Sequence, residues 1–391
     1  MFVLGGAQSD FARHLAREGT EISELVGELV DAALADAGVR ASDIQTIHVG
    51  NAFGQLFTGQ GHLGAMPATV RPALWGVPAM RHEAACASGS MAILAAMAEL
   101  EAGRYDCALV LGVEQERNVG GELAAKYLGA AAWVGHEAQR ARYVWPHLFS
   151  QIGDAYASLR REHLVAIAEQ ALANARDNPN AQTRGWTVAP DVLRAEGEDA
   201  RNPIVEGRLR RYDCAQVTDG GAAVILASPR FGRTGPRILG WGHRTVGLPL
   251  VQKLERREGL LMPHLAGCVD DARRRAGLAR EQIRGYEIHD CFTTTQYLAI
   301  DHLGLAPPGE SWRAIESGAT ARTGATPINP GGGLIGGGHP VGATGVRMVL
   351  DAARQVAGRA GAAQLAPGPI QTLNLGGSAA TVASFVVGVD R

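Results

Sequence analysis

Cys86 is the residue in this chain best placed for nucleophilic chemistry. It lies in the segment Arg81–Ser90, directly before the apolar helical pattern Met91–Leu100. Unpaired backbone N–H groups and the positive end of a helix dipole favour the thiolate at such a position, and the thiolate is the nucleophilic form of cysteine. We therefore expect covalent catalysis through an ionised Cys86. An isolated cysteine here is more often an inert thiol on a helix packing face, so the hypothesis needs support from other segments.

A glycine-rich segment supplies a second candidate group. Residues 329–345 contain eight glycines around one histidine, His339. Glycine at this density lets backbone approach backbone or ligand closely, and it is an entropic cost in a plain connector. The segment is neither Ser-rich nor repetitive, and a helical pattern follows it at once. We interpret it as a rigid loop that presents an imidazole, in preference to a flexible linker or an anion-binding loop.

A third polar cluster consists of His289, Asp290 and Cys291. It stands between a predicted strand at 285–288 and a predicted helix at 293–303. Junctions of this kind are where α/β sheets place functional side chains. Surface polarity or a helix-capping aspartate explains the cluster equally well from these residues alone.

Strand-like and helix-like patterns alternate along most of the chain, which is typical of an α/β protein. Apolar runs at 106–113 and 218–228 predict buried strands. Between Glu116 and Asn202 the pattern changes, and an amphipathic helix is predicted at 158–172. We predict an N-terminal half formed by 1–115 and 203–231, an inserted loop or cap domain at 116–202, and a C-terminal half at 232–391.

The C-terminal half repeats the pattern of the first. A helix predicted at 344–354 follows a small-residue loop, as the helix after Cys86 does, and a strand pair is predicted at 370–377 and 380–387. Two similar halves, each with a helix N-terminus directed toward a shared centre, place Cys86 and the loop 332–344 face to face.

Composition excludes several classes of protein. The 391 residues are 46% hydrophobic and carry a formal net charge of −2, so no overall field favours nucleic acid or an anionic membrane as a partner. Five cysteines without a CxxC pair argue against a disulfide framework and a structural zinc site. Three of them, Cys107, Cys214 and Cys268, lie in or beside apolar stretches and are interpreted as core residues. Asp10 and Arg13 come too early for a signal peptide, so we expect a cytoplasmic protein.

Four motifs give the sequence a family resemblance. They are Ala85-Cys-Ala-Ser-Gly89, His289-Asp-Cys-Phe292, Gly338-His-Pro-Val-Gly-Ala-Thr-Gly345 and Asn374-Leu-Gly-Gly377. Their order and approximate spacing resemble the thiolase superfamily, closest to its sterol-carrier-protein-2-type or acetyl-CoA C-acetyltransferase branch, over essentially the whole chain. The resemblance implies the α/β thiolase fold, in which two similar βαβαβαββ halves form a five-layered αβαβα sandwich with an inserted loop domain.

The resemblance also implies a role for each motif residue. Cys86 carries the acyl group as a thioester, and His339 is the base that activates it. His339 and a water held by His289 form one oxyanion hole, for the enolate oxygen. The backbone N–H groups of Cys86 and Gly376 form the other, at the acylated cysteine. Preorganised donors of this kind typically contribute about 3 kcal/mol each to transition-state stabilisation.

The C-terminal motif departs from the pattern of many thiolases. Those proteins have a second cysteine in a Cys-x-Gly turn, which moves the proton on the α-carbon of acetyl-CoA. This chain has Asn374-Leu-Gly376 instead, and an amide cannot act as that acid or base. In the branch with the His-Asp-Cys-Phe motif a cysteine of that loop takes the role, so the resemblance implies Cys291 as the second acid/base.

The expected substrate is coenzyme A or an acyl-CoA. Arg184 and Trp186 of the inserted segment are predicted to contact its phosphates and adenine, and Gly337 and Gly338 to contribute to substrate binding. Three further candidates on the predicted helix are explained equally well as a solvated face: Arg160, Arg161 and His163. We expect no metal ion and no tightly bound cofactor.

The leading hypothesis for function is an acyl-CoA C-acyltransferase of the thiolase type, which performs 3-ketoacyl-CoA thiolysis or the reverse Claisen condensation through acyl-Cys86. One alternative is a thiolase-like transfer to a non-CoA acceptor, such as a phenolic ring carbon, in a multi-protein complex. Another is a ketoacyl synthase of the same fold, which Cys291 and the Gly-rich loop disfavour. The last is a non-catalytic acyl-CoA-binding or lipid-binding relative, which the presence of Cys86 disfavours. The resemblance implies a homodimer or homotetramer, with accessory subunits as a further option.

Overall fold

The central strands pair in one continuous order, which divides into two sheets where only a single residue pair connects neighbouring strands. The computed structural model describes residues 1–195 and 197–389. The first sheet has the spatial order β3 (Ala79–His82), β2 (Thr46–Gly50), β4 (Cys107–Glu114), β7 (Gly220–Ala227) and β1 (Phe2–Gln8), and the second has the order β8 (Arg237–Thr245), β11 (Thr381–Gly388), β10 (Ile370–Gly376) and β9 (Gly285–Ile288). β1 and β8 share one residue pair, Phe2 with Arg237. The sheets therefore meet at one corner, where the two halves join.

The pairing of strands repeats between the halves. β2 is parallel to β3 and β4, and β4 is antiparallel to β7. In the second half β9 is parallel to β10, which is antiparallel to β11. Ile328 forms a parallel bridge with Tyr286 of β9, at the position that β3 occupies beside β2. The internal similarity predicted from the sequence is thus present in the sheets.

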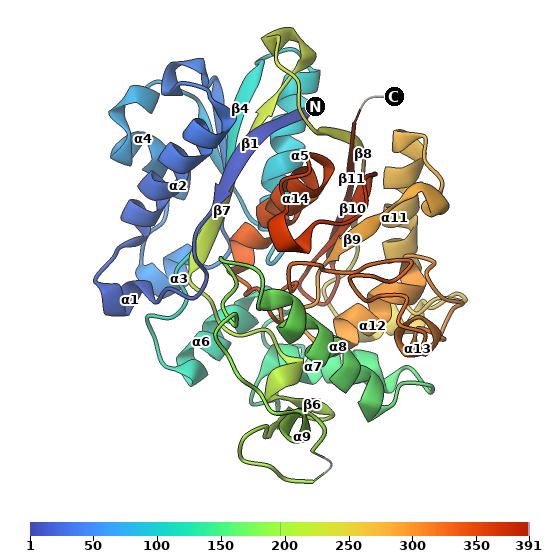
Figure 1. Cartoon of the computed structure of the whole chain (residues 1–391). Helices are drawn as coiled ribbons and strands as arrows, with labels where there is room; N and C mark the ends of the chain where they lie inside the picture. The colour runs from blue at the N-terminus through green and yellow to red at the C-terminus, as the bar shows by residue number, and fades with distance from the viewer. Residues whose placement is uncertain (196, 390–391) are drawn as a thin grey trace.

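Helices form three layers around the two sheets (Figure 1). α5 (Ser88–Glu101) and α14 (Thr344–Val356) lie between the sheets, and their apolar side chains join those of both sheets in one core. α2 (Ile22–Ala37) packs on the outer face of the first sheet, while α11 (Pro263–Ala276) and α12 (Thr293–His302) cover the second. The order helix, sheet, helix, sheet, helix is the five-layered arrangement that was predicted.

Glycines allow the two central helices to meet at their N-termini. A Cβ on Gly89 of α5 would lie 2.8 Å from the Gly342 carbonyl oxygen and 2.9 Å from the Val346 nitrogen. A Cβ on Gly345 of α14 would lie 2.4 Å from the Ser90 nitrogen. Since real Cβ contacts are longer than this, only glycine permits the approach. The turns that precede these two helices are therefore held face to face.

The segment between β4 and β7 covers the end of the sheets where α5 and α14 begin (Figure 1). It forms α6 (Gly121–Leu128), α7 (Val144–Asp154), α8 (Arg161–Ala175), α9 (Pro190–Leu193), β5 (Ile204–Glu206) and β6 (Leu209–Arg210). Phe149 of α7 stacks on Phe292, with ring centroids 4.7 Å apart, so this layer is anchored beside the His289–Phe292 motif. The short helices elsewhere are α1 (Leu15–Glu18), α3 (Gly54–Thr58), α4 (Met66–Val70), α10 (Leu250–Glu255) and α13 (Trp312–Glu316). The predicted domain boundaries stay a prediction.

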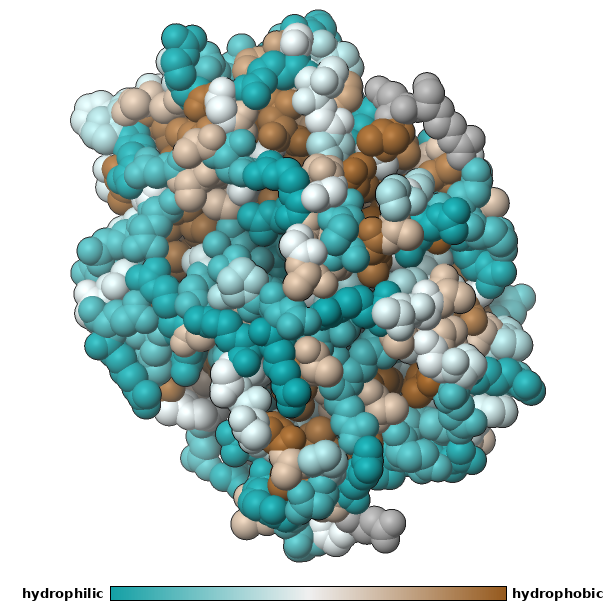
Figure 2. Space-filling view, in the orientation of Figure 1, coloured by the Kyte–Doolittle hydropathy of each residue, from teal (hydrophilic) through white to brown (hydrophobic). Residues whose placement is uncertain are grey.

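Polar residues predominate on the face drawn in Figure 2, and apolar ones form separate patches there. Within 1–195 and 197–389, no helix combines the length and the hydropathy that a membrane crossing requires.

Candidate active site

Cys86 lies between β3 and α5, on a turn that side-chain hydrogen bonds stabilise. Ala85 has a φ of +50°, a conformation that costs a non-glycine residue on the order of 1–3 kcal/mol. The Glu83 carboxylate accepts the Ala85 N–H at 2.6 Å. The Ser88 hydroxyl accepts the Ala84 N–H at 2.9 Å and donates to the Ala85 carbonyl at 2.6 Å. These bonds hold the strained turn and fix the direction of the thiol.

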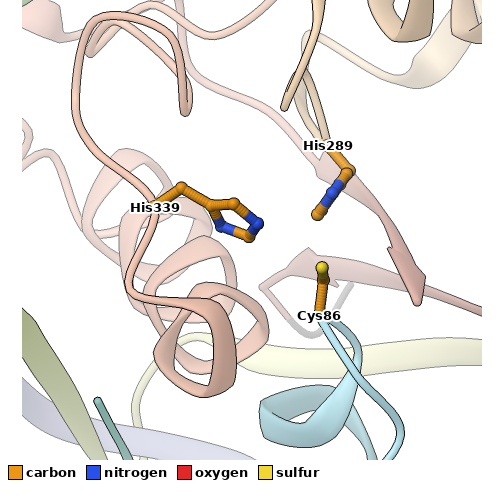
Figure 3. A group of neighbouring side chains, drawn as sticks. All are labelled: Cys86, His289 and His339. Atoms are coloured by element: carbon orange, nitrogen blue, oxygen red, sulfur yellow. The ribbon is translucent and has the colours of Figure 1, made fainter. Parts of the chain in front are cut away.

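Cys86, His289 and His339 converge from three segments that are far apart in the sequence (Figure 3). The sulfur and one nitrogen of each imidazole all lie within 4.8 Å of one another. The two rings meet edge to face, with centroids 5.0 Å apart and an interplanar angle of 85°. The structure therefore brings together the nucleophile and the histidine of the glycine-rich loop, as the sequence predicted.

Thr344 determines which nitrogen of His339 carries the proton. The Thr344 hydroxyl lies 2.7 Å from His339 Nδ1 and 3.2 Å from the Pro340 carbonyl oxygen. Because the carbonyl can only accept, the hydroxyl donates to Pro340 and accepts from Nδ1–H. His339 Nε2 then has a free lone pair, so the ring is prepared to act as a base.

Asn374 fixes the opposite tautomer in His289, with the ring proton on the other nitrogen than in His339. Its side-chain oxygen accepts the Ser90 hydroxyl at 2.7 Å, and its NH₂ group donates to the Cys86 carbonyl at 3.2 Å and to His289 Nδ1 at 3.0 Å. His289 Nε2 therefore carries the ring proton and acts as a hydrogen-bond donor. A thiol and two imidazoles are also a ligand set for zinc, but His289 in this state offers no lone pair to a metal ion.

The protonation of the centre differs from the sequence-based expectation of a thiolate. Burial, and to a smaller extent the nearby Glu116 carboxyl, raises the pKa of the Cys86 thiol to about 12. Burial also lowers the pKa of His339 to about 3, with a smaller contribution from the Arg347 cation. Both shifts favour the uncharged forms, because desolvation by the surrounding protein outweighs the helix N-terminus. The resting centre is thus a thiol beside a neutral imidazole.

Two backbone N–H groups approach the sulfur of Cys86. They belong to Cys86 itself and to Gly377, and both lower the pKa of the thiol. Gly376, which the family resemblance implies for this role, packs its Cα against the turn that precedes Cys86, where a Cβ would lie 2.2 Å from the Ala84 carbonyl oxygen. The amide that faces the cavity is that of the next residue, because the tight turn after β10 directs it there.

A cavity of about 320 Å³ opens beside these groups. Cys86, His339 and Gly377 form part of its wall, and so does Cys291, whose sulfur lies 3.6 Å from the Thr295 hydroxyl. Burial raises the pKa of the Cys291 thiol well above its ordinary value, with the nearby Cys86 as a further cause. The rest of the wall is largely apolar and includes Phe53, Leu128, Val144, Trp145, Phe149, Phe292 and Val341.

Two cavity residues were not recognised from the sequence. Cys214 was interpreted as a core residue, but it lines the cavity and is half-buried; Cys107 and Cys268 are buried as expected. Glu116 lies two residues beyond β4 and lines the same cavity. Neither residue belongs to the four motifs that carry the family resemblance, and only the folded chain brings them beside Cys86.

The residues predicted to contact coenzyme A are not among those that line this cavity, and their role stays a prediction. Arg184 forms a two-point ion pair with Asp10, at 2.6 and 2.7 Å, and Trp186 lines a separate hollow on the outer side of α8. Gly338 packs against Thr218 and Phe11. The Gly337 carbonyl accepts the Gln182 N–H.

The other cationic residues considered for coenzyme A binding also form ion pairs with carboxylates. Arg160 and His163 contact Glu316 at 2.6 and 3.0 Å, and Arg161 contacts Asp213 at 2.5 Å. The cation that lines the cavity is the exposed Arg211.

A cysteine opposed by two neutral histidines, between two similar α/β halves, is an arrangement that covalent catalysis can use. Two family models match the chain: thiolase, N-terminal domain, over residues 1–139, and thiolase C-terminal domain-like, over residues 251–388. The acetyl-CoA acetyltransferase of Methanothermobacter thermautotrophicus is 30% identical over 93% of each chain. Human sterol carrier protein 2 is 28% identical, over 99% of this chain and 72% of its own length. This chain belongs to the thiolase superfamily.

Solved structures agree on the fold. A protein titled Ltp2-ChsH2(DUF35) aldolase has a TM-score of 0.77 at 20% identity, over 100% of this chain and 98% of its own. The Acat5 thiolase of Ascaris suum, solved in complex with coenzyme A, has a TM-score of 0.71 at 17% identity, over 99% of each chain. The predicted family, fold and enzyme class are therefore confirmed.

Proposed function

We propose that this chain is an acyl-CoA C-acyltransferase of the thiolase type, which cleaves a 3-ketoacyl-CoA with coenzyme A or catalyses the reverse Claisen condensation. The observation that carries the proposal is the convergence of Cys86, His289 and His339 within 4.8 Å. Their hydrogen bonds hold one imidazole as a base and the other as a donor. Nucleophilic acyl transfer requires both functions beside the thiol.

The first half-reaction transfers the acyl group to Cys86. His339 Nε2 accepts the thiol proton while the sulfur attacks C3 of the 3-ketoacyl-CoA. The N–H groups of Cys86 and Gly377 stabilise the oxyanion that forms on the C3 oxygen. When the C2–C3 bond breaks, its electron pair passes to acetyl-CoA as an enolate, and the acyl group remains on Cys86 as a thioester.

Cys291 and His289 complete the turnover. His289 Nε2–H donates to the enolate oxygen, directly or through a water, while the Cys291 thiol protonates C2. The Cys291 thiolate then accepts the proton of coenzyme A, whose sulfur attacks the thioester. Cys86 leaves and recovers its proton from His339, so all groups return to their starting states. By microscopic reversibility the same groups serve condensation.

Coenzyme A is the proposed carrier of the acyl group, as a substrate. The cavity has an apolar wall for an acyl chain and the exposed Arg211 among its lining residues, where a phosphate can be neutralised. A relative of the same fold was solved with coenzyme A. The cytoplasm is the proposed location, since the five cysteines are free thiols.

A homodimer is the proposed assembly. β3 lies at the edge of its sheet, where its outward backbone groups can pair with a second chain. Met80 in β3 is 42% exposed and the neighbouring Trp75 is 73% exposed. An edge strand with exposed apolar side chains is well suited to a symmetric contact with another copy.

The test is cleavage of acetoacetyl-CoA in the presence of free coenzyme A, followed as formation of acetyl-CoA. The proposal predicts turnover by the wild type and a loss of at least about a thousandfold in Cys86→Ala. Absence of turnover by a folded wild type, together with an unmodified Cys86 after exposure to acetyl-CoA, would indicate a binding protein. Acetylated Cys86 without turnover would indicate transfer to a different acceptor.

A further inference from the structure

Glu116 is a buried acid that the proposed reaction does not use. It lines the cavity beside Cys86, and only 1% of its surface is exposed. Neither carboxyl oxygen has a hydrogen-bond partner in the described part of the chain. The Val341 N–H lies near the carboxyl, but its geometry falls short of a hydrogen bond. A buried polar group in this state costs free energy unless a ligand satisfies it.

The surroundings of Glu116 favour its protonated form. Glu114 and Asp219 lie close to it, and the pKa of Glu116 is raised well above its ordinary value by burial first and by these two carboxyls second. Both neighbours are already satisfied: Glu114 accepts from the Ala52 N–H at 2.5 Å, and Asp219 accepts from the Leu15 and Arg117 N–H groups at 2.9 and 2.8 Å. Burial raises the pKa of Glu114 as well, to about 7, but the N–H groups that it accepts from favour its charged form. Glu116 lacks such partners and is therefore the member of the trio that holds a proton.

The cavity wall around this acid is apolar. Phe53 and Val341 belong to a small hydrophobic cluster that Cys86 also contacts. A neutral carboxylic acid in such a wall can donate one hydrogen bond and accept another, and it can satisfy neither against an alkyl chain. A hydroxyl group on the acyl chain at the matching position satisfies both, and a keto oxygen accepts the hydrogen bond that the acid donates.

We propose that Glu116 selects acyl groups that bear a hydroxyl or keto oxygen in addition to the reacting carbonyl, by a hydrogen bond inside the cavity that both Glu116 and Cys86 line. This inference rests on the proposed function, because it assumes that the acyl group is held on Cys86. It names the substrate class of that site as oxygenated acyl-CoA esters, in contrast to plain alkanoyl-CoA esters.

The test compares acylation of Cys86 by hexanoyl-CoA, 3-hydroxyhexanoyl-CoA and 6-hydroxyhexanoyl-CoA in single-turnover experiments, with acyl-Cys86 measured by mass spectrometry. The variants are Glu116→Met, which keeps the length but removes the polar group, and Glu116→Gln, which keeps a donor and an acceptor. Glu122→Met is the matched control, because Glu122 is an exposed glutamate of α6. Thermal unfolding confirms that each variant is folded.

We expect the wild type to react at least about tenfold faster with one of the hydroxylated esters than with hexanoyl-CoA. Glu116→Met should lose this preference and accept hexanoyl-CoA as well as or better than the wild type. Glu116→Gln and Glu122→Met should retain most of the preference. A preference that is absent from the wild type or unchanged in Glu116→Met overturns the inference. So does an equal loss with all three esters in Glu116→Met, which would place Glu116 on the reacting atoms. No acylation of the wild type by any ester would instead overturn the proposed function.

Discussion

At the scale of single residues, burial decides the charge on the Cys86 sulfur. The position of Cys86 before a helix indicated a thiolate, yet burial holds its pKa at about 12 and that of His339 at about 3. Burial could not be judged from local sequence, because the groups that exclude water come from 53–57, 124–131 and 341 as well as from the motif itself. The helix N-terminus favours the anion, but the dry surroundings outweigh it.

The protonation of Cys86 can be measured by the ultraviolet absorbance of thiolates. A thiol with a pKa of about 12 stays protonated at every pH well below that value. A thiolate absorbs more strongly in the ultraviolet than a thiol does. The wild type and Cys86→Ser should therefore show no difference in thiolate absorbance from pH 6 to about pH 9. A difference that is already present at pH 7 would indicate the thiolate–imidazolium pair instead.

Cys291 should be required for chemistry at the α-carbon and dispensable for acylation. Cys291→Ala is expected to form acyl-Cys86 from acetyl-CoA but to exchange the α-protons of acetyl-CoA with deuterated water at least about a hundredfold more slowly. Proton exchange followed by nuclear magnetic resonance checks this. The matched control is Cys214→Ala, which removes another cavity thiol and should leave the exchange in place. Undiminished exchange in Cys291→Ala would remove Cys291 from the mechanism.

Glu116 should destabilise the protein as the pH rises. Its folded pKa is raised above the ordinary value of 4.5, so the folded state binds the proton more tightly than the unfolded state. The stability that the tighter proton binding provides is fully present below the pKa of Glu116 in the unfolded state. It is lost as the pH rises toward the pKa of Glu116 in the folded state. Glu116→Gln does not titrate, so its melting temperature relative to the wild type should increase between pH 5 and pH 8. A relative melting temperature that does not change with pH would contradict the assignment.

At the scale of elements, the sequence predicted the central helices and most strands well. The strand at 285–288 agrees with β9, and the helix after Cys86 with α5, because apolar periodicity and small-residue turns mark both. The contacts of Arg184 and Trp186 could not be predicted in the same way. Arg184 is neutralised by Asp10, which is distant in the sequence, and no local pattern reveals such a pair. The N–H group beside the Cys86 sulfur belongs to Gly377, one residue beyond the Gly376 that the resemblance implies, because turn geometry, which local sequence does not reveal, decides which amide faces the sulfur.

The close contact of α5 and α14 should be sensitive to a single methyl group. Gly89→Ala places a Cβ 2.8 Å from the Gly342 carbonyl oxygen, so the helices must separate, at a cost of about 1–3 kcal/mol. Separation also moves His339 away from Cys86, and a shift of about 1 Å can lower the rate about a hundredfold. The measurements are the unfolding free energy and the rate of Cys86 acylation. Gly185→Ala, where the new Cβ meets no atom within 4 Å, is the control, and equal behaviour of the two variants would refute the contact.

At the scale of the whole molecule, the duplicated halves explain why the catalytic groups are so far apart in the sequence. In each half a central helix begins at the shared centre, directly after a turn that carries a site residue. Cys86 therefore comes from one half and His339 from the other. The exposed edge at β3 leaves room for a second copy on the N-terminal half. Light scattering should therefore give about twice the 41.0 kDa of one chain.

The proposed interface can be broken by one charge. Met80→Lys places an ammonium group on the β3 edge and should convert the dimer to monomers, because a buried unpaired charge is costly. Val251→Lys is the control, since Val251 is 59% exposed on α10 and should leave the mass unchanged. A dimer that persists in Met80→Lys would place the interface on another surface.

The central claim is that the acyl group resides on the sulfur of Cys86 after His339 has taken its proton. The most direct measurement is rapid acid quenching of the protein mixed with acetoacetyl-CoA, followed by mass spectrometry of the Cys86 peptide. We expect one acetyl group on Cys86 in the wild type, formed at least about a hundredfold more slowly in His339→Asn. A wild-type enzyme that cleaves acetoacetyl-CoA while Cys86 stays unmodified, or a His339→Asn variant that acylates at the wild-type rate, would contradict it.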